Sequence, residues 1–368
     1  MIKERIERDR ATRTLYTMDM FVTKCFCLQR HTDNLSSYHY TFPLVYAATA
    51  NTYVETITTM ADSLHRAIKR ATIRDIAMEY LETVKIVGKR VELAKMDVIL
   101  AFDVTDEEYY GRLETPYLHT WTGENGVTGK FKFLTCAIVC SRAPLKVPVF
   151  SMPVKIGDDL AKVVIEVLAL VRQIVGRIAL ILFDRGFYAK NLMMALDENN
   201  YPYLIFVPKN KKIKRELDSM CKGEMKMILY EFKLNKDKTT KRGKTTLAFL
   251  KQIYAGKTNR EYDWSFATNK KIEDIEELVK EYKKRWRIET MFRVQDEARI
   301  LSKSKDIRIR YFYFMYSQML LLLWAGIFKE KLGFKEFLLV MTEYAKMRAE
   351  KEERKMQVPP WVSQRHRE

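Results

Sequence analysis

Two aspartates lie at the ends of apolar segments, where their carboxylates are expected to be buried and to need a partner. Asp103 lies near the end of the apolar run 98–104, and Asp184 directly follows the apolar run 178–183. Strand side chains alternate between two faces, so each Asp points the same way as the apolar residues two and four positions earlier. An unpaired buried carboxylate is costly, so each needs a partner. An Arg or a helix N-terminus would satisfy one such Asp, whereas two on adjacent strands favour a divalent metal ion.

The third acid, Glu289, lies on a predicted helix over 281–292. Spacings of three and four residues place on one stripe the side chains of Leu278, Tyr282, Arg285, Glu289 and Phe292. Because Ile275 and Leu278 turn that stripe toward the core, we expect Glu289 to face inward. Two explanations stay open. Arg285 can neutralise Glu289 as a structural ion pair, or Glu289 can bind metal and leave Arg285 for a phosphate.

The elements that must position these acids follow a mixed α/β order. We expect strands at 98–104, 131–139 and 147–154, a helix at 158–175, a strand at 178–183, a further helix, and a strand at 203–207. This order predicts a mixed central sheet covered on both faces. Sites in α/β proteins are built at strand ends, which is where Asp103 and Asp184 fall.

Residues 209–257 interrupt this order with a strongly basic segment. They hold 15 Lys or Arg and five Asp or Glu, a net charge of +10 in a chain whose total is +18 and whose pI is about 9.5. Short strands are expected near 228–232 and 246–251. A solvated loop region is one explanation for this charge, but its density favours a β-rich insertion that contacts the phosphates of nucleic acid.

The first 95 residues are predicted to be mostly helical. Apolar residues recur with helical spacing over 54–68 and 73–84, and Thr72 with Asp75 forms a helix-start pattern between them. The basic residues near this junction are Arg66, Lys69, Arg70 and Arg74. The pair could be a DNA-binding helix-turn-helix or an ordinary helical hairpin with solvated charges, and the sequence leaves both open.

One stretch requires a membrane test. Tyr311–Phe328 carries no charge for 18 residues, close to spanning length. It contains Ser317 and Gln318 and stands alone, so we interpret it as a buried helix of a soluble core. The start of the chain has no apolar signal core, so we expect an intracellular protein with no membrane partner.

The cysteines do not predict a disulfide framework, because the five are odd in number and irregularly spaced. Cys25, Cys27, His31 and His39 could bind zinc, although the gap between the two cysteines departs from the usual zinc spacing. The sequence leaves this open.

Three of these patterns together resemble a known family. Asp103 on a strand, Asp184-Arg-Gly-Phe-Tyr188 after a strand, and Tyr282-x-x-Arg285-x-x-x-Glu289 on a helix resemble the signature regions of DDE transposases. They are most similar to the prokaryotic insertion-sequence group with a Tyr-Arg-Glu-Lys signature, over about residues 95–330. One position departs from that signature, because Asp296 stands where the group has Lys. Lys303 or Arg299 could replace that Lys.

The resemblance implies a ribonuclease-H-like core with a β-rich insertion between the second Asp and the Glu. The domains expected on this basis are a helical domain that is a candidate for DNA binding (1–95), the first part of the core (96–208), the basic insertion (209–270), the catalytic helix with the end of the core (271–330), and a C-terminal helical segment (331–368).

The resemblance also implies an activity, which is cleavage of the ends of an insertion sequence and their joining to target DNA. Asp103, Asp184 and Glu289 would hold two Mg²⁺ ions, for which Mn²⁺ can substitute, with Asp103 as the bridging ligand. The expected DNA contacts are Tyr282, Arg285, Trp264, Lys209, Lys211, Lys212, Lys241 and Arg242. Trp264 would stack on a flipped base, and the alternative for it is a core Trp.

The expected partner is double-stranded DNA, both the terminal repeats of the element and the target, bound by a homodimer in a synapse. The expected location is the nucleoid in the cytoplasm. Two alternatives to a transposase stay open: a ribonuclease-H-like nuclease or resolvase that cuts without joining, and a transposase-derived DNA-binding protein without catalysis. Asp296 leaves room for the second.

Overall fold

The chain forms two structural units, each described here by itself. The computed structural model describes residues 2–26, 37–112, 114–121, 126–141, 145–236, 239–254, 261–271, 275–329 and 331–357. The helical unit combines Met1–Arg90 with Phe292–Glu368, and the sheet unit is Val91–Met291. Both ends of the chain therefore belong to the same unit, and the sheet unit is inserted between them.

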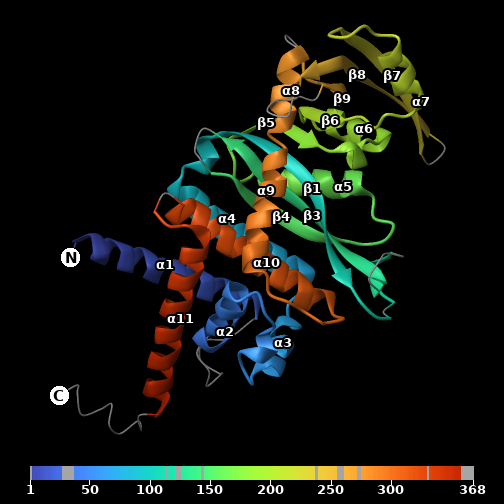
Figure 1. Cartoon of the computed structure of the whole chain (residues 1–368). Coiled ribbons are helices and arrows are strands. Elements are labelled where there is room, and N and C mark those ends of the chain that lie inside the picture. Colours follow the sequence, from blue (N-terminus) through green and yellow to red (C-terminus); the bar gives the residue numbers. More distant parts are fainter. Residues whose placement is uncertain are drawn as a thin grey trace. The chain divides into compact units, whose positions relative to one another are not determined.

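The described residues of the sheet unit form a nine-stranded mixed sheet in the order β2-β3-β1-β5-β6-β9-β8-β7, with β4 paired to β3 (Figure 1). β1 runs parallel to β5 and β5 parallel to β6, whereas β1, β3 and β4 form an antiparallel meander. The strands are β1 (Asp97–Tyr109), β2 (Leu118–Thr120), β3 (Gly129–Ser141), β4 (Val147–Val154), β5 (Arg177–Phe183), β6 (Tyr203–Phe206), β7 (Met225–Lys236), β8 (Thr239–Tyr254) and β9 (Glu261–Thr268).

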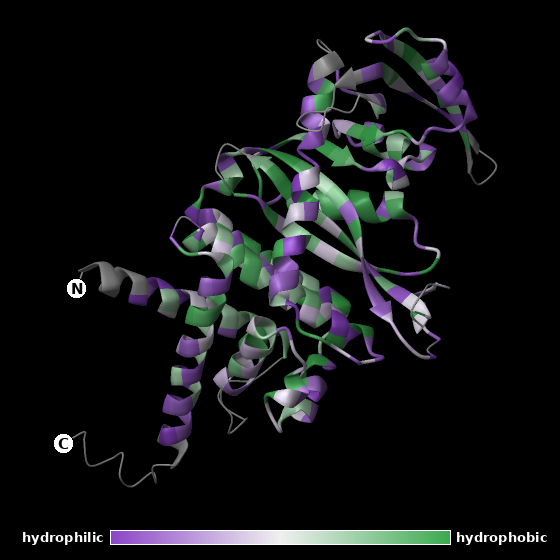
Figure 2. Cartoon of the chain, in the orientation of Figure 1, coloured by the Kyte–Doolittle hydropathy of each residue, from purple (hydrophilic) through white to green (hydrophobic). Residues whose placement is uncertain are grey.

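The core order β4-β3-β1-β5-β6 is that of a ribonuclease-H-like fold, which the family resemblance implies. Helix α5 (Leu160–Val171) leads from β4 into β5, and α6 (Lys190–Glu198) leads from β5 into β6. The Asp159 carboxylate starts α5 by accepting a hydrogen bond from the Ala161 backbone N–H at 3.1 Å. The central strands are apolar (Figure 2), because both of their faces are covered.

The basic insertion continues the core sheet. After α7 (Lys211–Asp218), β7 and β8 form a long hairpin, and β9 pairs with both β8 and β6. The prediction of a β-rich insertion is confirmed. The direct pairing of β9 with β6 was not foreseen, because strand patterns do not indicate partners distant in sequence.

The helical unit is built around α10, most of whose residues are buried. α4 packs against both α10 and α1, and α11 packs against α2. Its elements are α1 (Ile2–Cys25), α2 (Tyr38–Thr49), the 3₁₀ turn η1 (Val54–Thr56), α3 (Ala61–Ile68), α4 (Ile73–Arg90), the 3₁₀ turn η5 (Asp296–Ala298), α10 (Ile307–Leu323), the π-helical η6 (Trp324–Phe328) and α11 (Phe334–Gln357). α9 (Trp286–Gln295) crosses the boundary between the two units.

The helix start at Thr72 is confirmed. The Asp75 carboxylate accepts hydrogen bonds from the backbone N–H and the hydroxyl of Thr72, at 2.8 and 2.7 Å, and the Thr72 hydroxyl accepts one from the Asp75 N–H. The prediction of one helix over 54–68 was wrong, because α3 begins only at Ala61. α4 packs on α10 and α1, and both the helical hairpin and the DNA-binding helix-turn-helix stay predictions.

By length and composition, Ile307–Phe328 could cross a membrane, as the only such helix among the described residues. Of its most apolar 18-residue window, 72% is buried inside the protein, which agrees with the predicted core helix. Cys25 is buried. Cys27 and His31, which the possible zinc site requires, lie outside the described residues.

Candidate active site

The first two acids come from neighbouring parallel strands. The register of β1 and β5 pairs Ala101 with Leu182 and Phe102 with Phe183. The two Phe rings stack at 5.3 Å between centroids and hold the strand ends together. Asp103 and Asp184 are the next residues along the chain. Asp184 directly follows β5, as predicted. The expected place of Asp103 near the end of a strand was wrong, because pairing with β3 extends β1 as far as Tyr109.

Asp184 is fixed by a tight turn. Its Oδ1 accepts a hydrogen bond from the Gly186 backbone N–H at 2.8 Å and so caps the 3₁₀ turn η4 (Arg185–Phe187). A Cβ atom at Gly186 would lie 3.1 Å from that same oxygen, closer than ordinary contact. The glycine therefore gives the carboxylate room at the end of β5, and Asp184 stays half-buried.

Glu289 lies on α9, and the helix that carries it is interrupted. The predicted continuous helix over 281–292 was wrong, because α8 (Ile275–Lys283) ends before Arg285 and α9 starts after it. At the break, the N–H of Arg285 donates to the Tyr282 carbonyl at 2.9 Å, and the N–H of Ile288 donates to the Arg285 carbonyl at 2.9 Å. These are three-residue steps, tighter than those of an α-helix.

The break changes which side of α9 is buried. Ile288 and Met291 face the core, whereas the Glu289 side chain is 50% exposed. The expectation of an inward-facing Glu289 is thus corrected. The physical reason is that the three-residue steps shift the phase of α9 relative to α8.

Arg285 joins two of the three acids. One guanidinium nitrogen, Nη1, lies 3.3 Å from Asp103 Oδ2, and Nη2 lies 2.6 Å from Glu289 Oε1. The Arg285 side chain is only 9% exposed and that of Asp103 18% exposed. Of the two explanations for Glu289, the structure has the ion pair with Arg285.

The charges of the three acids act on one another. Burial raises the pKa of Asp103 to about 6, Arg285 and the Val104 N–H pull it down, and the charges of Asp184 and Glu289 raise it. The three carboxylates therefore share one electrostatic neighbourhood, in which burial outweighs the neighbouring guanidinium.

A buried polar row extends from Asp103 across the sheet, and sequence analysis missed it. Asp103 pairs with Thr135 in the β1–β3 register, and Thr135 pairs with Ser151 on β4. The hydroxyls of Thr135 and Ser151 are 2.8 Å apart and buried. Hydroxyl residues within otherwise apolar strands were the available signal.

Arg287 was also missed. Its Nη1 donates to the Val139 carbonyl on β3 at 2.7 Å, so it ties the start of α9 to the sheet. It thereby contributes to the placement of Glu289. Only the tertiary fold reveals this contact, because Val139 lies far away in sequence.

Tyr282 and Trp264 lie in an aromatic cluster. Trp264 is 4% exposed and Tyr282 equally so, and both pack against Phe206 and Phe266. This burial favours the core alternative for Trp264 and corrects its assignment as a base-stacking residue. Tyr282, too, is not accessible to DNA in this arrangement, because its ring is covered.

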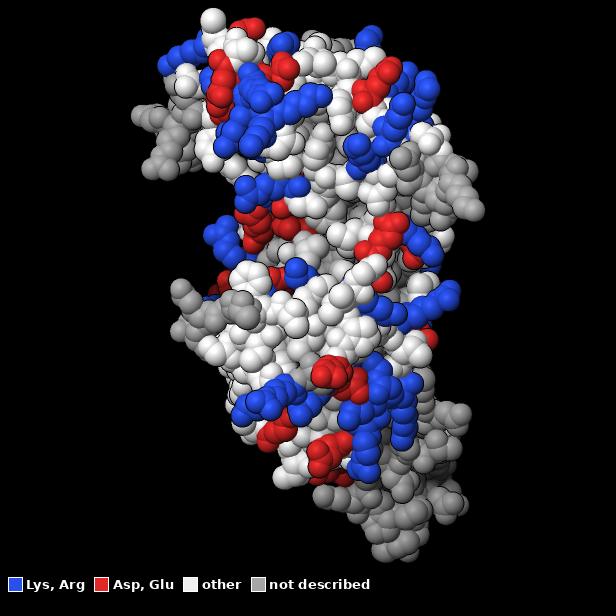
Figure 3. Space-filling view, turned by 90° about the vertical axis from the view of Figure 1, so that its right-hand side faces the viewer, with Lys and Arg blue, Asp and Glu red and all other residues white. Residues whose placement is uncertain are grey.

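The basic residues expected to contact DNA are exposed, namely Lys209, Lys211, Lys212, Lys241 and Arg242. Lys and Arg side chains gather at the upper end of the face in Figure 3, which α7 and the β7–β8 hairpin form in Figure 1. The Lys209 ammonium lies 5.2 Å from the centroid of the exposed Tyr262 ring, and that of Lys212 lies 5.0 Å from Tyr230. This surface presents cations and aromatic faces together, as nucleic-acid-binding surfaces do.

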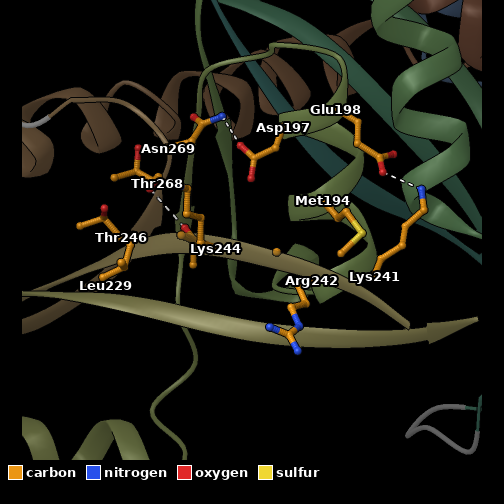
Figure 4. Close-up of a pocket in the computed structure, with 12 residues that line it drawn as sticks. Met194, Asp197, Glu198, Leu229, Lys241, Arg242, Lys244, Thr246, Thr268 and Asn269 are labelled. Atoms are coloured by element: carbon orange, nitrogen blue, oxygen red, sulfur yellow. Dashed lines mark hydrogen bonds and ion pairs between the residues drawn. The ribbon is translucent and has the colours of Figure 1, made fainter. Parts of the chain in front are cut away.

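A pocket of about 540 Å³ lies between α6 and this hairpin (Figure 4). At its rim Lys241 forms an ion pair with Glu198 at 2.7 Å, and inside it Asn269 donates to Asp197 at 2.6 Å. Lys241 is thus already paired, although exposed ion pairs of this kind contribute little and exchange readily with a competing anion.

The oxygen atoms of Asp103, Asp184 and Glu289 are suitable ligands for a hard cation, but the three carboxylates do not converge on one point in the described structure. Carboxylate oxygens are the ligands that Mg²⁺ prefers. Within the described parts of the chain, no three Asp, Glu, His or Cys side chains lie close enough together to hold an ion. The Arg285 guanidinium occupies the space between Asp103 and Glu289.

The position of the signature Lys belongs to the helical unit. Asp296 lies in η5, and the Lys303 ammonium stands 4.9 Å from the centroid of the Tyr53 ring. The Arg299 backbone N–H donates to the Asn51 side chain at 2.9 Å. A replacement of the signature Lys by Lys303 or Arg299 stays a prediction.

Comparisons with known proteins agree on the class of fold. Residues 159–324 match the family model of the transposase DDE domain, a range that contains Asp184 and Glu289. Among solved structures, the chain is similar to the cryo-EM structure of the piggyBac transposase synaptic complex with hairpin DNA. The TM-score is 0.51 at 12% identity, over 95% of this chain and 73% of that one. A search of curated proteins finds no match. The structural likeness establishes the fold, which is that of a DDE transposase.

Proposed function

We propose that this protein is a DNA transposase of an insertion sequence, which cleaves the ends of its element and joins them to target DNA. The observation that carries the proposal is the placement of the acids. Asp103 lies on β1, Asp184 directly follows the paired parallel strand β5, and Glu289 reaches Asp103 through Arg285. The match of residues 159–324 to the transposase DDE domain supports it.

Asp103, Asp184 and Glu289 would hold two Mg²⁺ ions, or Mn²⁺ in their place. When bound, the ions would activate the attacking water or DNA 3′-hydroxyl and stabilise the leaving oxygen. The chain's own residues prepare the site. Since the pKa of Asp103 is about 6, its carboxylate is ionised at neutral pH and ready to be a ligand. Asp184 is held in one orientation by the Gly186 N–H.

DNA would bind along the basic insertion. Lys209, Lys211 and Lys212 and the hairpin residue Arg242 are exposed, and phosphate contacts by such residues dominate DNA affinity. The similar piggyBac structure is a synaptic complex with hairpin DNA. By analogy, we propose that this chain binds its terminal repeats and target DNA as a homodimer in a synapse, at the bacterial or archaeal nucleoid.

A second candidate is a transposase-derived DNA-binding protein without catalysis. Asp296 at the signature Lys position favours it, as does the ion pairing of Arg285 with two of the acids. A nuclease that cuts without joining is the third candidate, and the same assay separates all of them.

The test is strand cleavage and transfer by the purified full-length protein, with Mg²⁺ or Mn²⁺ and the DNA that flanks its own gene. Asp184→Asn and Glu289→Gln should abolish metal-dependent joined products and retain DNA binding. Glu277→Gln is the matched control, because Glu277 is exposed on the neighbouring helix α8. Cleaved but unjoined DNA would identify a nuclease. Binding without chemistry in either metal would identify the non-catalytic DNA-binding protein.

A further inference from the structure

We propose that the Arg285 guanidinium competes with the divalent metal ion for the carboxylates of Asp103 and Glu289. The guanidinium must therefore leave these carboxylates before the metal ion can bind to them. The inference rests on the proposed function, because it assigns these two acids as metal ligands. It concerns a step before catalysis, the loading of the site.

The geometry places one guanidinium between carboxylates from two different elements. Nη1 lies 3.3 Å from Asp103 Oδ2 on β1, and Nη2 lies 2.6 Å from Glu289 Oε1 on α9. Each acid thus gives one oxygen to the same planar group. Asp103 and Glu289 are also two of the three acids that would hold the divalent ions.

The guanidinium and the metal exclude each other at these oxygens. A Mg²⁺ ion requires its ligand oxygens at about 2.0–2.1 Å. Like charges a few ångströms apart repel strongly where water is scarce, and the Arg285 side chain is only 9% exposed. In the described residues, no three acidic, His or Cys side chains converge enough to hold an ion, and Arg285 separates two of the three.

Arg285 lies outside a regular helix. It stands at the break between α8 and α9, so its position depends on a three-residue turn and not on the interior of a helix. Its Nε atom is buried and has no hydrogen-bond partner in the described part of the protein. The Tyr282 ring lies 5.7 Å from Arg285 Cζ, so the guanidinium contacts an aromatic face while it pairs with the two carboxylates.

A purely positioning role for Arg285 makes the opposite prediction. If the guanidinium only holds Glu289 near Asp103, its removal would let the two acids separate, and metal binding would weaken. Competition instead predicts that metal binding tightens when Arg285 is removed. The sign of the change therefore separates the two roles.

The experiment measures Mn²⁺ binding to the full-length protein without DNA, from the electron paramagnetic resonance signal of free Mn²⁺. We expect Arg285→Gln to bind Mn²⁺ more tightly than the wild type, by roughly fivefold or more. Fivefold is the lower end of the range by which one bound ligand typically changes the affinity for another. Arg285→Lys should be intermediate, because an ammonium cannot bridge two carboxylates as a planar fork does. Asp103→Asn should bind weakly with or without Arg285.

Circular dichroism of each variant shows whether it is folded, and Arg285→Lys keeps the test decisive if Arg285→Gln unfolds. Equal or weaker Mn²⁺ binding by both Arg285 variants than by the wild type would overturn the inference and leave the metal site itself intact. Absence of Mn²⁺ binding by the wild type and by both variants would overturn the inference together with the proposed metal-dependent function.

Discussion

Replacement of Asp103 by Asn should stabilise the metal-free protein at alkaline pH. Burial raises the pKa of Asp103 from 3.8 to about 6, although Arg285 lies 3.3 Å away and pulls the pKa down. A difference of about two in pKa corresponds to about 3 kcal/mol between the two protonation states. Asn keeps the shape of the protonated acid and cannot ionise, so it removes the free-energy cost of holding a charged carboxylate at this buried position.

The pH dependence has a definite sign. The folded protein holds the Asp103 proton more tightly than the unfolded chain does, because the folded pKa is the higher one. The stability contributed by protonated Asp103 is complete below about pH 4 and is lost as the pH rises through about 6. The stability gain of Asp103→Asn should therefore be larger at pH 8 than at pH 4, by about 2 kcal/mol.

The assay is urea unfolding followed by circular dichroism at pH 4 and pH 8, with EDTA present. Asp306→Asn serves as a control of opposite sign, because hydrogen bonding to Arg308 lowers the pKa of Asp306. For that variant the titration is extended to pH 2, and it should lose more stability at pH 8 than at pH 2, because the stability from ionised Asp306 is lost only as the pH falls below about 4. If Asp103→Asn likewise loses more stability at pH 8, attraction to Arg285 outweighs burial and the reasoning fails.

Three further predictions concern separate parts of the chain. Asp75→Ala removes both hydrogen bonds to Thr72 and should cost about 1 kcal/mol of unfolding free energy in urea titrations, and an unchanged midpoint would contradict the cap. Gly243→Ala places a Cβ 2.7 Å from the Phe232 ring and should destabilise by about 1–3 kcal/mol, whereas a higher melting temperature would show that the ring can move away. Arg242→Gln should weaken DNA binding in filter-binding titrations and reduce the slope of log affinity against log salt by about 1, and an unaltered slope would remove Arg242 from the phosphate contacts.

Predictions from sequence succeeded where a local pattern determines the structure. The apolar run before Asp184 predicts a buried strand, and β5 ends at Phe183 as expected. β4 occupies the predicted range Val147–Val154. In each case the information lies in side chains within a few residues of one another.

The failures occurred where distant contacts decide. Spacings of three and four persist through the break at Arg285, so periodicity could not detect that the helix is interrupted. The exposure of Glu289 follows from that break. The burial of Trp264 depends on Phe206 and Tyr282, which lie on other elements, and no local pattern distinguishes a core Trp from one that binds DNA.

The pairing of β9 with β6 has a mechanical consequence. Leu204, Ile205 and Phe206 of β6 are in register with Thr268, Ala267 and Phe266 of β9. A force applied to the β7–β8 hairpin would therefore reach the strand beside β5 as shear along a backbone ladder. Excision of the hairpin and β9 would leave β6 as a bare sheet edge, so this segment cannot be exchanged between proteins as an independent module.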